Sequence, residues 1–167
     1  MVILGIDPGI GKVGWGVIKD ESSKQIAIEY GCFETQSKIN LEDRLTKIYD
    51  FVTLLIDRFD PEVLAIEQLY FAANSKTALI VGQARGVILL AASKSHLPTA
   101  SYTPLQVKQA LTGYGRADKN QIQSMVGSIL HLPKKVAQDD AADALAIAIT
   151  HVFSYKIRKI SQYKLKQ

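Results

Sequence analysis

Residues 1–9 of the chain are MVILGIDPG. The apolar run, rich in β-branched residues, predicts a buried strand that Pro8 and Gly9 bring to an end. Asp7 is the only charged residue in this stretch. A carboxylate at the end of a buried strand is costly unless a cation offsets its desolvation, although an aspartate that caps the next turn is an alternative. Other carboxylates that fold back onto Asp7 would therefore favour a cation site.

The segments that follow predict a sheet with helices. Residues 12–19 and 25–35 indicate two more strands, which form an antiparallel meander with the first. The Gly-Trp-Gly sequence in the first of these segments would let another backbone approach closely. Helical spacing over residues 40–59 predicts a helix, and a short apolar run then ends in Glu67. A strand reached through a helix is expected to lie parallel to and beside the first strand, with Glu67 at the same sheet edge as Asp7.

The composition indicates one globular domain. Of the 167 residues, 47% are hydrophobic and 22% are charged, and we expect a single domain over residues 1–155 with a basic tail over residues 156–167 that can be disordered. No apolar run approaches the roughly 20 residues of a membrane span. Cys32 is the only cysteine, which excludes an intramolecular disulfide and argues against a cysteine-based metal site, so we interpret it as an inert core residue. These features predict a cytoplasmic protein.

The net charge of +4 conceals a segregation of charges along the chain. Residues 72–138 carry eight Lys or Arg and one acid, Asp118. This asymmetry favours a surface for an anionic polymer, although a solvated lysine-rich face is a common alternative. Residues 112–119, with Arg116 and Lys119, form a glycine-rich loop that lacks the ending of a nucleotide P-loop. Such a loop could contact a phosphate backbone or only solvent.

Two adjacent aromatic residues, Tyr70 and Phe71, follow the predicted strand that ends in Glu67. Core packing is their commoner role, but they could also stack on an unpaired base. A long helix is predicted from Ser75 onward. Its inward or close-contact positions are expected to include Leu79, Gly82, Gly86 and Leu90.

Residues 138–149, QDDAADALAIAI, predict a buried helix that begins with acids. Asp140 and Asp143 lie three apart and share a helix face, but Asp139 and Asp143 lie four apart and could also share one, so the spacing leaves the pair open. Acids at a helix N-terminus also cap it and complement its dipole. The alanines would let this helix lie tightly on a sheet and bring its acids near a strand end.

Clustered carboxylates raise one another's pKa unless a cation neutralises them. Mg²⁺ or Mn²⁺ suits a cluster without His or Cys, and two such ions are a standard device for displacement at phosphorus. A basic surface nearby would position a nucleic acid through its phosphates. The residues therefore predict a metal-dependent phosphodiesterase that acts on nucleic acid.

Four motifs, in order and at matching spacing, resemble those of the RuvC family of Holliday-junction resolvases. They are GIDPG at 5–9, AIEQ at 65–68, GQARG at 82–86 and DAADALA at 140–146, and the match extends to about His151. The resemblance implies an α/β protein with the ribonuclease H-like fold. This fold has a mixed five-stranded sheet, an antiparallel meander plus parallel strands, with helices on both faces.

The resemblance also implies a homodimeric endonuclease that resolves four-way DNA junctions by paired symmetric nicks in recombination and repair. Water activated by Mg²⁺, with two ions per active site, would attack the scissile phosphate. The catalytic and metal-binding carboxylates would be Asp7, Glu67, Asp140 and Asp143, and Asp139 would be a helix cap. Candidate DNA contacts are Tyr70, Phe71, Lys76, Lys108, Arg116 and Lys119.

Two of these lysines, Lys108 and Lys119, match family lysines near the DNA, and Tyr70 takes a position where the family usually has phenylalanine. The resemblance further implies that the helix containing residues 82–86 lies near the dimer interface and that the RuvA and RuvB branch-migration proteins are partners.

Three alternatives compete with this interpretation. Another nuclease of the same fold, such as a YqgF-like protein, would not be expected to match over residues 68–86. An actin-like or sugar-kinase ATPase also ends its first strand in Asp, but that fold duplicates its domain and 167 residues are too few. A non-catalytic junction-binding module would be expected to lack one of the four carboxylates, and none is missing.

Overall fold

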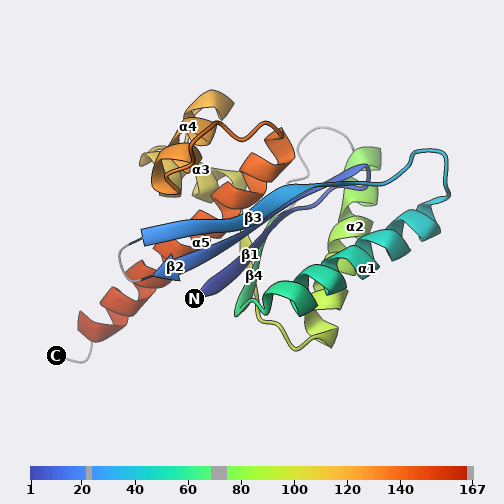
Figure 1. The fold of residues 1–167 in the computed structure, drawn as a ribbon, viewed down its shortest axis with the longest axis horizontal. Coiled ribbons are helices and arrows are strands. Elements are labelled where there is room, and N and C mark those ends of the chain that lie inside the picture. The colour runs from blue at the N-terminus through green and yellow to red at the C-terminus, as the bar shows by residue number, and fades with distance from the viewer. Residues whose placement is uncertain (22–23, 69–74, 165–167) are drawn as a thin grey trace.

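A five-stranded sheet with the strand order β3-β2-β1-β4-β5 runs through the molecule (Figure 1). The computed structural model describes residues 1–21, 24–68 and 75–164. In chain order the elements are β1 (Val2–Asp7), β2 (Lys12–Glu21), β3 (Lys24–Glu34), α1 (Leu41–Phe59), β4 (Val63–Glu67), α2 (Ser75–Lys94), β5 (Thr99–Tyr102), α3 (Pro104–Thr112), α4 (Lys119–Ile129) and α5 (Asp139–Lys164). β1, β2 and β3 form an antiparallel meander, and β1, β4 and β5 pair in parallel. The predicted mixed sheet is confirmed.

Helices cover both faces of the sheet, with α1 and α2 on one face and α3, α4 and α5 on the other (Figure 1). Each face has its own apolar core, to which alternate residues of the central strands contribute. In β1, Leu4 and Ile6 join the α1/α2 core, whereas Ile3 joins the α3–α5 core. No helix among the described residues is long and apolar enough to cross a membrane.

The same alternation places the two acidic strand ends on one face. In β4, Leu64 and Ile66 join the α1/α2 core and Ala65 joins the other. Asp7 follows Ile6 and Glu67 follows Ile66, and those two isoleucines are paired in the parallel ladder. Asp7 and Glu67 therefore emerge side by side at the carboxyl edge of the sheet, on the face covered by α5.

α5 lies directly on the glycines of β1 and β2. A Cβ at Gly14 would overlap the backbone carbonyl of Asp140, and one at Gly16 would come within 2.6 Å of Leu145 Cδ2. The side chain between them, Trp15, points to the opposite face and packs in the α1/α2 core. The close backbone approach predicted from the Gly-Trp-Gly sequence is confirmed, and its partner is the helix that begins with acids.

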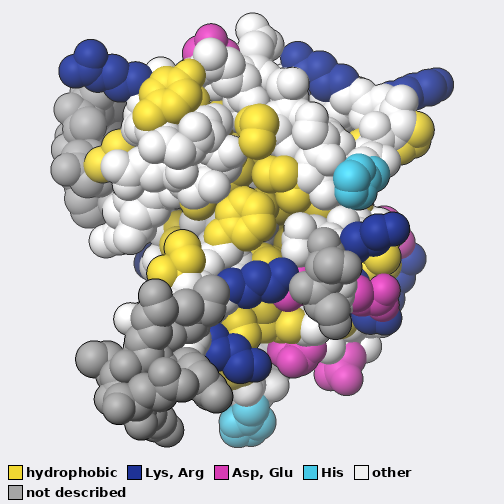
Figure 2. Space-filling view, turned by 90° about the vertical axis from the view of Figure 1, so that its left-hand side faces the viewer, with side chains coloured by type: hydrophobic (Ala, Val, Ile, Leu, Met, Phe, Trp, Pro, Cys, Tyr) yellow, Lys and Arg dark blue, Asp and Glu magenta, His cyan; other side chains and the backbone are white. Residues whose placement is uncertain are grey.

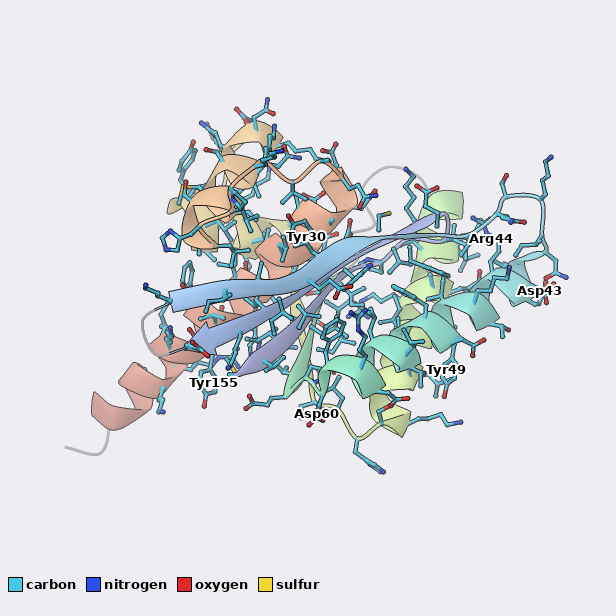
Figure 3. The ribbon with its side chains drawn as sticks, viewed as in Figure 1. Tyr30, Asp43, Arg44, Tyr49, Asp60 and Tyr155 are labelled. Atoms are coloured by element: carbon cyan, nitrogen blue, oxygen red, sulfur yellow. The ribbon has the colours of Figure 1, made fainter. Side chains whose placement is uncertain are left out.

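α1 has the ends that the sequence predicts. Asn40 is the N-cap, its side chain accepting a hydrogen bond from the Asp43 backbone N–H, and Asp60 ends the helix in a left-handed conformation. Figure 3 shows Asp43 and Arg44 at one end of α1 and Asp60 at the other. Arg44 Nε donates to Thr35 Oγ1 at 2.9 Å, and Thr35 in turn donates to the Ile10 carbonyl. This chain of contacts ties the start of α1 to the turn that follows Asp7.

α2 turns a different face to the core from the one predicted. Its buried residues are Ala84, Ile88, Ala91 and Ala92. Of the positions expected to be inward or in close contact, Gly82 is half-buried. Leu79 and Leu90 are 67% and 52% exposed, and Gly86 is also exposed, with open space where a side chain would begin. The reason for the error is that α2 is apolar around much of its circumference, so spacing alone does not identify its buried side.

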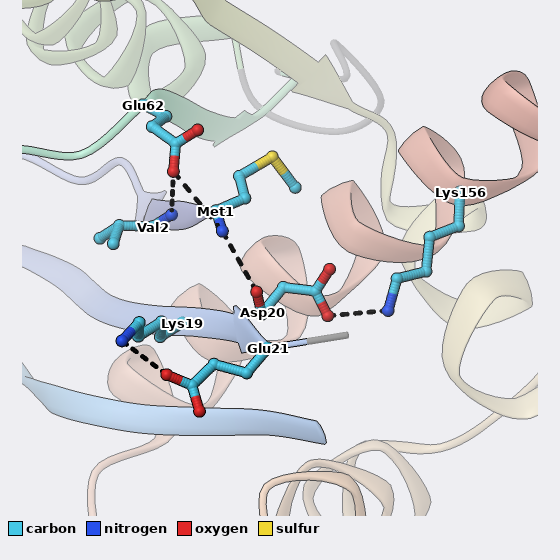
Figure 4. Close-up of polar contacts among 7 residues, drawn as sticks. All are labelled: Met1, Val2, Lys19, Asp20, Glu21, Glu62 and Lys156. Atoms are coloured by element: carbon cyan, nitrogen blue, oxygen red, sulfur yellow. Dashed lines mark hydrogen bonds and ion pairs between the residues drawn. The ribbon is translucent and has the colours of Figure 1, made fainter. Parts of the chain in front are cut away.

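Ion pairs fix the end of the sheet opposite to Asp7. Lys156 Nζ lies 2.7 Å from Asp20 Oδ1, and the Met1 ammonium group lies 3.5 Å from Glu62 Oε1 and donates to the Asp20 carbonyl at 3.1 Å (Figure 4). α5 continues to Lys164, so residues 156–164 of the basic tail are helical. Figure 2 views this end and shows apolar side chains through its middle with basic side chains beside them.

Candidate active site

A cleft of about 240 Å³ opens at the carboxyl edge of β1 and β4. Three acidic side chains line it, Asp7 from β1, Glu67 from β4 and Asp143 from α5. α3 and α4 complete its wall and contribute Lys108 and Lys119. The topology thus gathers three acids and two lysines that are far apart in the sequence into one site.

Among the acids of the cleft, Asp7 has the most strongly raised pKa. Burial, reinforced by the charges of Glu67, Asp143 and Asp140, raises its pKa to about 7, and Lys119 opposes this rise. Burial and the charge of Asp143 also raise the pKa of Glu67, against an opposing hydrogen bond with Asp7. The cleft is therefore short of positive charge, which is the condition expected of a cation-binding site.

The acids at the start of α5 face different neighbours. Asp143 lines the cleft, and burial raises its pKa although Lys119 opposes the change. Asp140 lines an adjoining pocket with Lys12 and Cys32, and the Cys32 thiol donates to Asp140 Oδ2 at 3.7 Å. Three of the four predicted carboxylates therefore share one cleft, and the fourth lies one helical turn away from Asp143.

Cys32 is not the core residue that we expected. It is half-buried, and burial together with Asp140 raises the pKa of its thiol to about 11, so the thiol stays protonated and unreactive at neutral pH. The expectation of an inert cysteine fits this pKa. Its position beside Asp140 had no signal in the sequence, because it depends on how β3 lies against α5.

Asp139 does not have the helix-capping contacts expected of it. It is the first residue of α5, where its side chain accepts a hydrogen bond from Gln123 Nε2 at 2.7 Å and lies 3.2 Å from Lys119 Nζ. Both partners belong to α4, and Gln123 is buried. Asp139 thus joins α5 to α4, a role that only the tertiary packing defines.

Lys119 bridges two of these acids. Its Nζ lies 3.2 Å from Asp139 Oδ2 and 3.5 Å from Asp143 Oδ2. Although partial burial lowers the pKa of Lys119, Asp139 and Asp143 together raise it, so the side chain is a cation at neutral pH. Lys119 lines both the cleft and the pocket of Asp140. It is therefore a cation shared by the two groups of acids.

The donor chemistry of the cleft fits a hard divalent cation. Within the described residues, no three acidic, histidine or cysteine side chains are already arranged around a common point as a metal-binding group. In this arrangement Lys119 pairs with Asp143, and Asp140 accepts from Cys32. Carboxylates with raised pKa values in a shared cleft are nevertheless the ligand set that Mg²⁺ or Mn²⁺ prefers.

The predicted DNA contacts fall into three groups. Lys108 and Lys119 line the cleft, and Arg116 is exposed in the segment between α3 and α4. Lys76 belongs to α2, but its side chain is outside what the structure describes. Tyr70 and Phe71 lie outside the described residues, so the predicted base-stacking element stays a prediction.

Comparisons with known proteins agree on one family. Residues 3–151 match the family model described as crossover junction endodeoxyribonuclease RuvC. Relatives with that name include one from Desulforamulus reducens, 50% identical over 90% of this chain and 93% of its own, and one from Moorella thermoacetica, 52% identical over 90% of each chain.

Solved structures give the same result. The RuvC structure from Thermus thermophilus is 37% identical, has a TM-score of 0.87, and is matched over 94% of this chain and 96% of its own. The same protein in complex with a Holliday junction substrate is also similar, at 35% identity and a TM-score of 0.87 over the same shares of the two chains. The yeast mitochondrial Holliday junction resolvase Ydc2, 17% identical with a TM-score of 0.63 over 96% of this chain and 83% of its own, shares the fold. The predicted ribonuclease H-like fold is confirmed.

Proposed function

Because the chain belongs to the RuvC family of crossover junction endodeoxyribonucleases, we propose that it resolves Holliday junctions at the cleft formed by β1, β4 and α5. The observation that carries the site assignment is the convergence of Asp7, Glu67 and Asp143 in one cleft that Lys108 and Lys119 also line. Hydrolysis of a phosphodiester requires carboxylates that can hold a metal ion and positively charged side chains that can bind the phosphate. This cleft contains both.

The metal ligands in this proposal are Asp7, Glu67, Asp140 and Asp143, which would hold Mg²⁺, with Mn²⁺ as a substitute and two ions per site. A bound divalent cation supplies the charge that activates a water and stabilises the leaving oxygen. The carboxylates contribute by holding that charge at the sheet edge. Their own repulsion, seen in the raised pKa of Asp7 and of Glu67, is relieved when a cation binds.

In this proposal Lys119 both offsets the charge of nearby carboxylates and binds a phosphate. Without a metal it neutralises Asp143 and Asp139. Asp143 would also be a ligand of the cation, and the Lys119 ammonium would donate to a non-bridging oxygen of the scissile phosphate. Lys108 lines the same cleft, has no ion pair among the described residues, and would contact an adjacent phosphate.

The proposed partners are a four-way DNA junction and a second copy of the chain. Paired symmetric nicks require two active sites, and the exposed apolar residues of α2, Leu79, Ile80 and Leu90, offer a surface for the second copy. RuvA and RuvB are proposed partners on family resemblance. Stacking of Tyr70 or Phe71 on a junction base is part of the proposal, as are phosphate contacts from Lys76 and Arg116.

The test of the site assignment is Asp7→Asn. This change removes a proposed metal ligand and leaves the phosphate-binding lysines intact, so we expect cleavage of a synthetic four-way junction to fall by about a hundredfold or more while junction binding changes little. Cleavage is measured with Mg²⁺ and with EDTA, and binding by fluorescence anisotropy. Asp57→Asn, an exposed site on α1, is the matched control and should cut as the parent does.

Two results would contradict this assignment. Equal losses of binding and cleavage in Asp7→Asn would mean that Asp7 supports DNA contacts and not the chemistry. Equal cutting of the junction and of a linear duplex by the parent would leave a nuclease without junction selectivity.

A further inference from the structure

A second concave surface lies along the outer side of α4 and the segment that follows it. We call it the α4 groove; it has a volume of about 560 Å³, and its polar lining includes Asn120, Ser124, Ser128, Lys134 and Lys135. It begins one residue after Lys119, which lines the active-site cleft. The groove therefore adjoins the catalytic site and is not an isolated depression elsewhere on the molecule.

The chemistry of the α4 groove suits a phosphate backbone. Its described lining has two lysines, a histidine and several hydroxyl and amide groups, and it contains no acid. At Gly127, also in the lining, an added Cβ would meet nothing within 4 Å, so a ligand can approach the helix closely there. Hydrogen-bond donors around cations, with a point of close approach, are what backbone phosphates need.

Unlike several other lysines of the protein, the two lysines of the groove form no ion pair with a carboxylate among the described residues. Lys12, Lys19, Lys119 and Lys156 each pair with a carboxylate. For Lys134 and Lys135 the described residues provide no carboxylate within ion-pair distance, and Lys135 Nζ instead donates to Asn120 Oδ1 at 3.3 Å. The charges of both lysines are thus available to an anionic ligand.

The direction of α4 connects the groove with the cleft. α4 starts at Lys119 and its 11 residues span about 16 Å, enough for about four successive phosphates of one strand at 3.4 Å of axial rise each. Lys135 Nζ donates to Asn120, the residue that follows Lys119 in the chain. The charges of Lys119 and Lys135 therefore both lie near the start of α4.

We propose that the α4 groove binds the sugar–phosphate backbone of the junction arm that leaves the active site. The proposal rests on the proposed function for the identity of the ligand as DNA. Lys134 and Lys135 make phosphate contacts, so they add affinity and fix the angle of the arm without reading its sequence.

The test compares two pairs of charge removals in the full chain carrying Asp7→Asn, so that binding is measured without cleavage. The groove variant adds K134Q and K135Q. The control variant adds K24Q and K47Q, which remove the same amount of charge at two exposed sites. Lys24 begins β3, at the end of the sheet opposite to Asp7, and Lys47 lies on α1. Affinity for four-way junctions with long arms is titrated against salt, and again with arms trimmed to a few base pairs beyond the crossover.

Affinity falls as salt rises, and each lost phosphate contact makes this dependence of log affinity on log salt less steep by about 0.9. The slope of the groove variant should therefore be less steep than that of the parent by about 1.8 per protomer. The affinity ratio of parent to groove variant then shrinks about twelvefold between roughly 50 and 200 mM salt. With trimmed arms the parent and the groove variant should bind equally, because the phosphates that the groove would contact are absent.

A salt slope of the groove variant equal to that of the control variant would overturn the proposal. So would an equal loss of affinity on long and trimmed arms, which would indicate a general effect of net charge. The proposed function fails by a different observation, namely an Asp7-intact parent that cuts duplex and junction alike. In that case the salt slopes still report whether the groove binds a DNA backbone.

Discussion

Asp7 is held where its charge is opposed by burial and by three other carboxylates, and where one lysine partly compensates. Its pKa of about 7 means that a proton or a cation must satisfy it at neutral pH. Strand alternation could predict that Asp7 and Glu67 share one face, since each follows an isoleucine of the opposite core. It could not predict that Lys119 pairs with Asp143, because that contact depends on the placement of α4 over α5.

The raised pKa of Asp7 predicts how the stability of the metal-free protein depends on pH. The folded state binds more protons than the unfolded state between about pH 4 and 7, so the unfolding free energy falls as pH rises through this window, by about 4 kcal/mol at most from Asp7. Thermal melts in EDTA should therefore show a lower Tm at about pH 8 than at about pH 5. Asp7→Asn should raise the Tm at the higher pH and flatten the profile.

Asp57→Asn is again the control for that experiment, because it removes an exposed charge on α1. A metal-free Asp7→Asn protein that melts below the parent at the higher pH would show that the ionised carboxylate stabilises the fold. The electrostatic account of the cleft would then be wrong.

At the scale of the elements, the site depends on how closely α5 lies on the sheet. The sequence allows this packing to be predicted, since Gly14 and Gly16 flank Trp15 in β2 and the α5 segment is rich in alanine. The orientation of α2 could not be predicted in the same way, because Leu79 and Leu90 are as apolar as the buried Ile88. A helix that is apolar on several sides gives no period from which its inward face can be identified.

Gly14→Ala tests the contact between β2 and α5. The new Cβ would overlap the Asp140 carbonyl, so α5 must shift, and we expect a loss of about 1–3 kcal/mol in unfolding free energy. Because Asp140 and Asp143 move with the helix, cleavage should fall even at temperatures where the variant is fully folded. Urea denaturation and junction cleavage measure the two effects.

Gly127→Ala is the matched control for stability. Gly127 lies in α4 with no atom within 4 Å of an added Cβ, so the substitution should stabilise the protein by about 0.5–1 kcal/mol. If Gly14→Ala were as stable as the parent, the sheet and α5 would not be in backbone contact.

At the scale of the whole molecule, the two kinds of charge meet at the candidate active site. The segregation along the chain predicts a basic surface, and Lys108, Lys119, Lys134 and Lys135 of the basic segment do line the cleft and the α4 groove. The sequence could not show which cations are already neutralised. Lys156 belongs to the segment expected to form a basic tail, yet it is paired with Asp20 at 2.7 Å within a helix.

The apolar face of α2 carries the prediction that concerns assembly. Leu79 and Leu90 are more than half exposed, so replacing both with glutamate costs the fold little but places charges in the proposed interface between two copies. By light scattering we expect the parent to have twice the 18.4 kDa mass of one chain and the double variant to have the single mass. Leu54→Glu, which changes a 56% exposed leucine on α1, is the control and should remain a dimer.

The same variant separates assembly from chemistry. A monomer that keeps the cleft should nick one strand of a cruciform plasmid and yield relaxed circles, whereas two coupled sites cut both strands and yield linear DNA. A double variant that still has the dimer mass would place the interface elsewhere on the molecule. A monomer that still linearises the plasmid would mean that the two cuts are made by independent encounters, so that the symmetry of the junction, and not that of the protein, sets the pairing of the nicks.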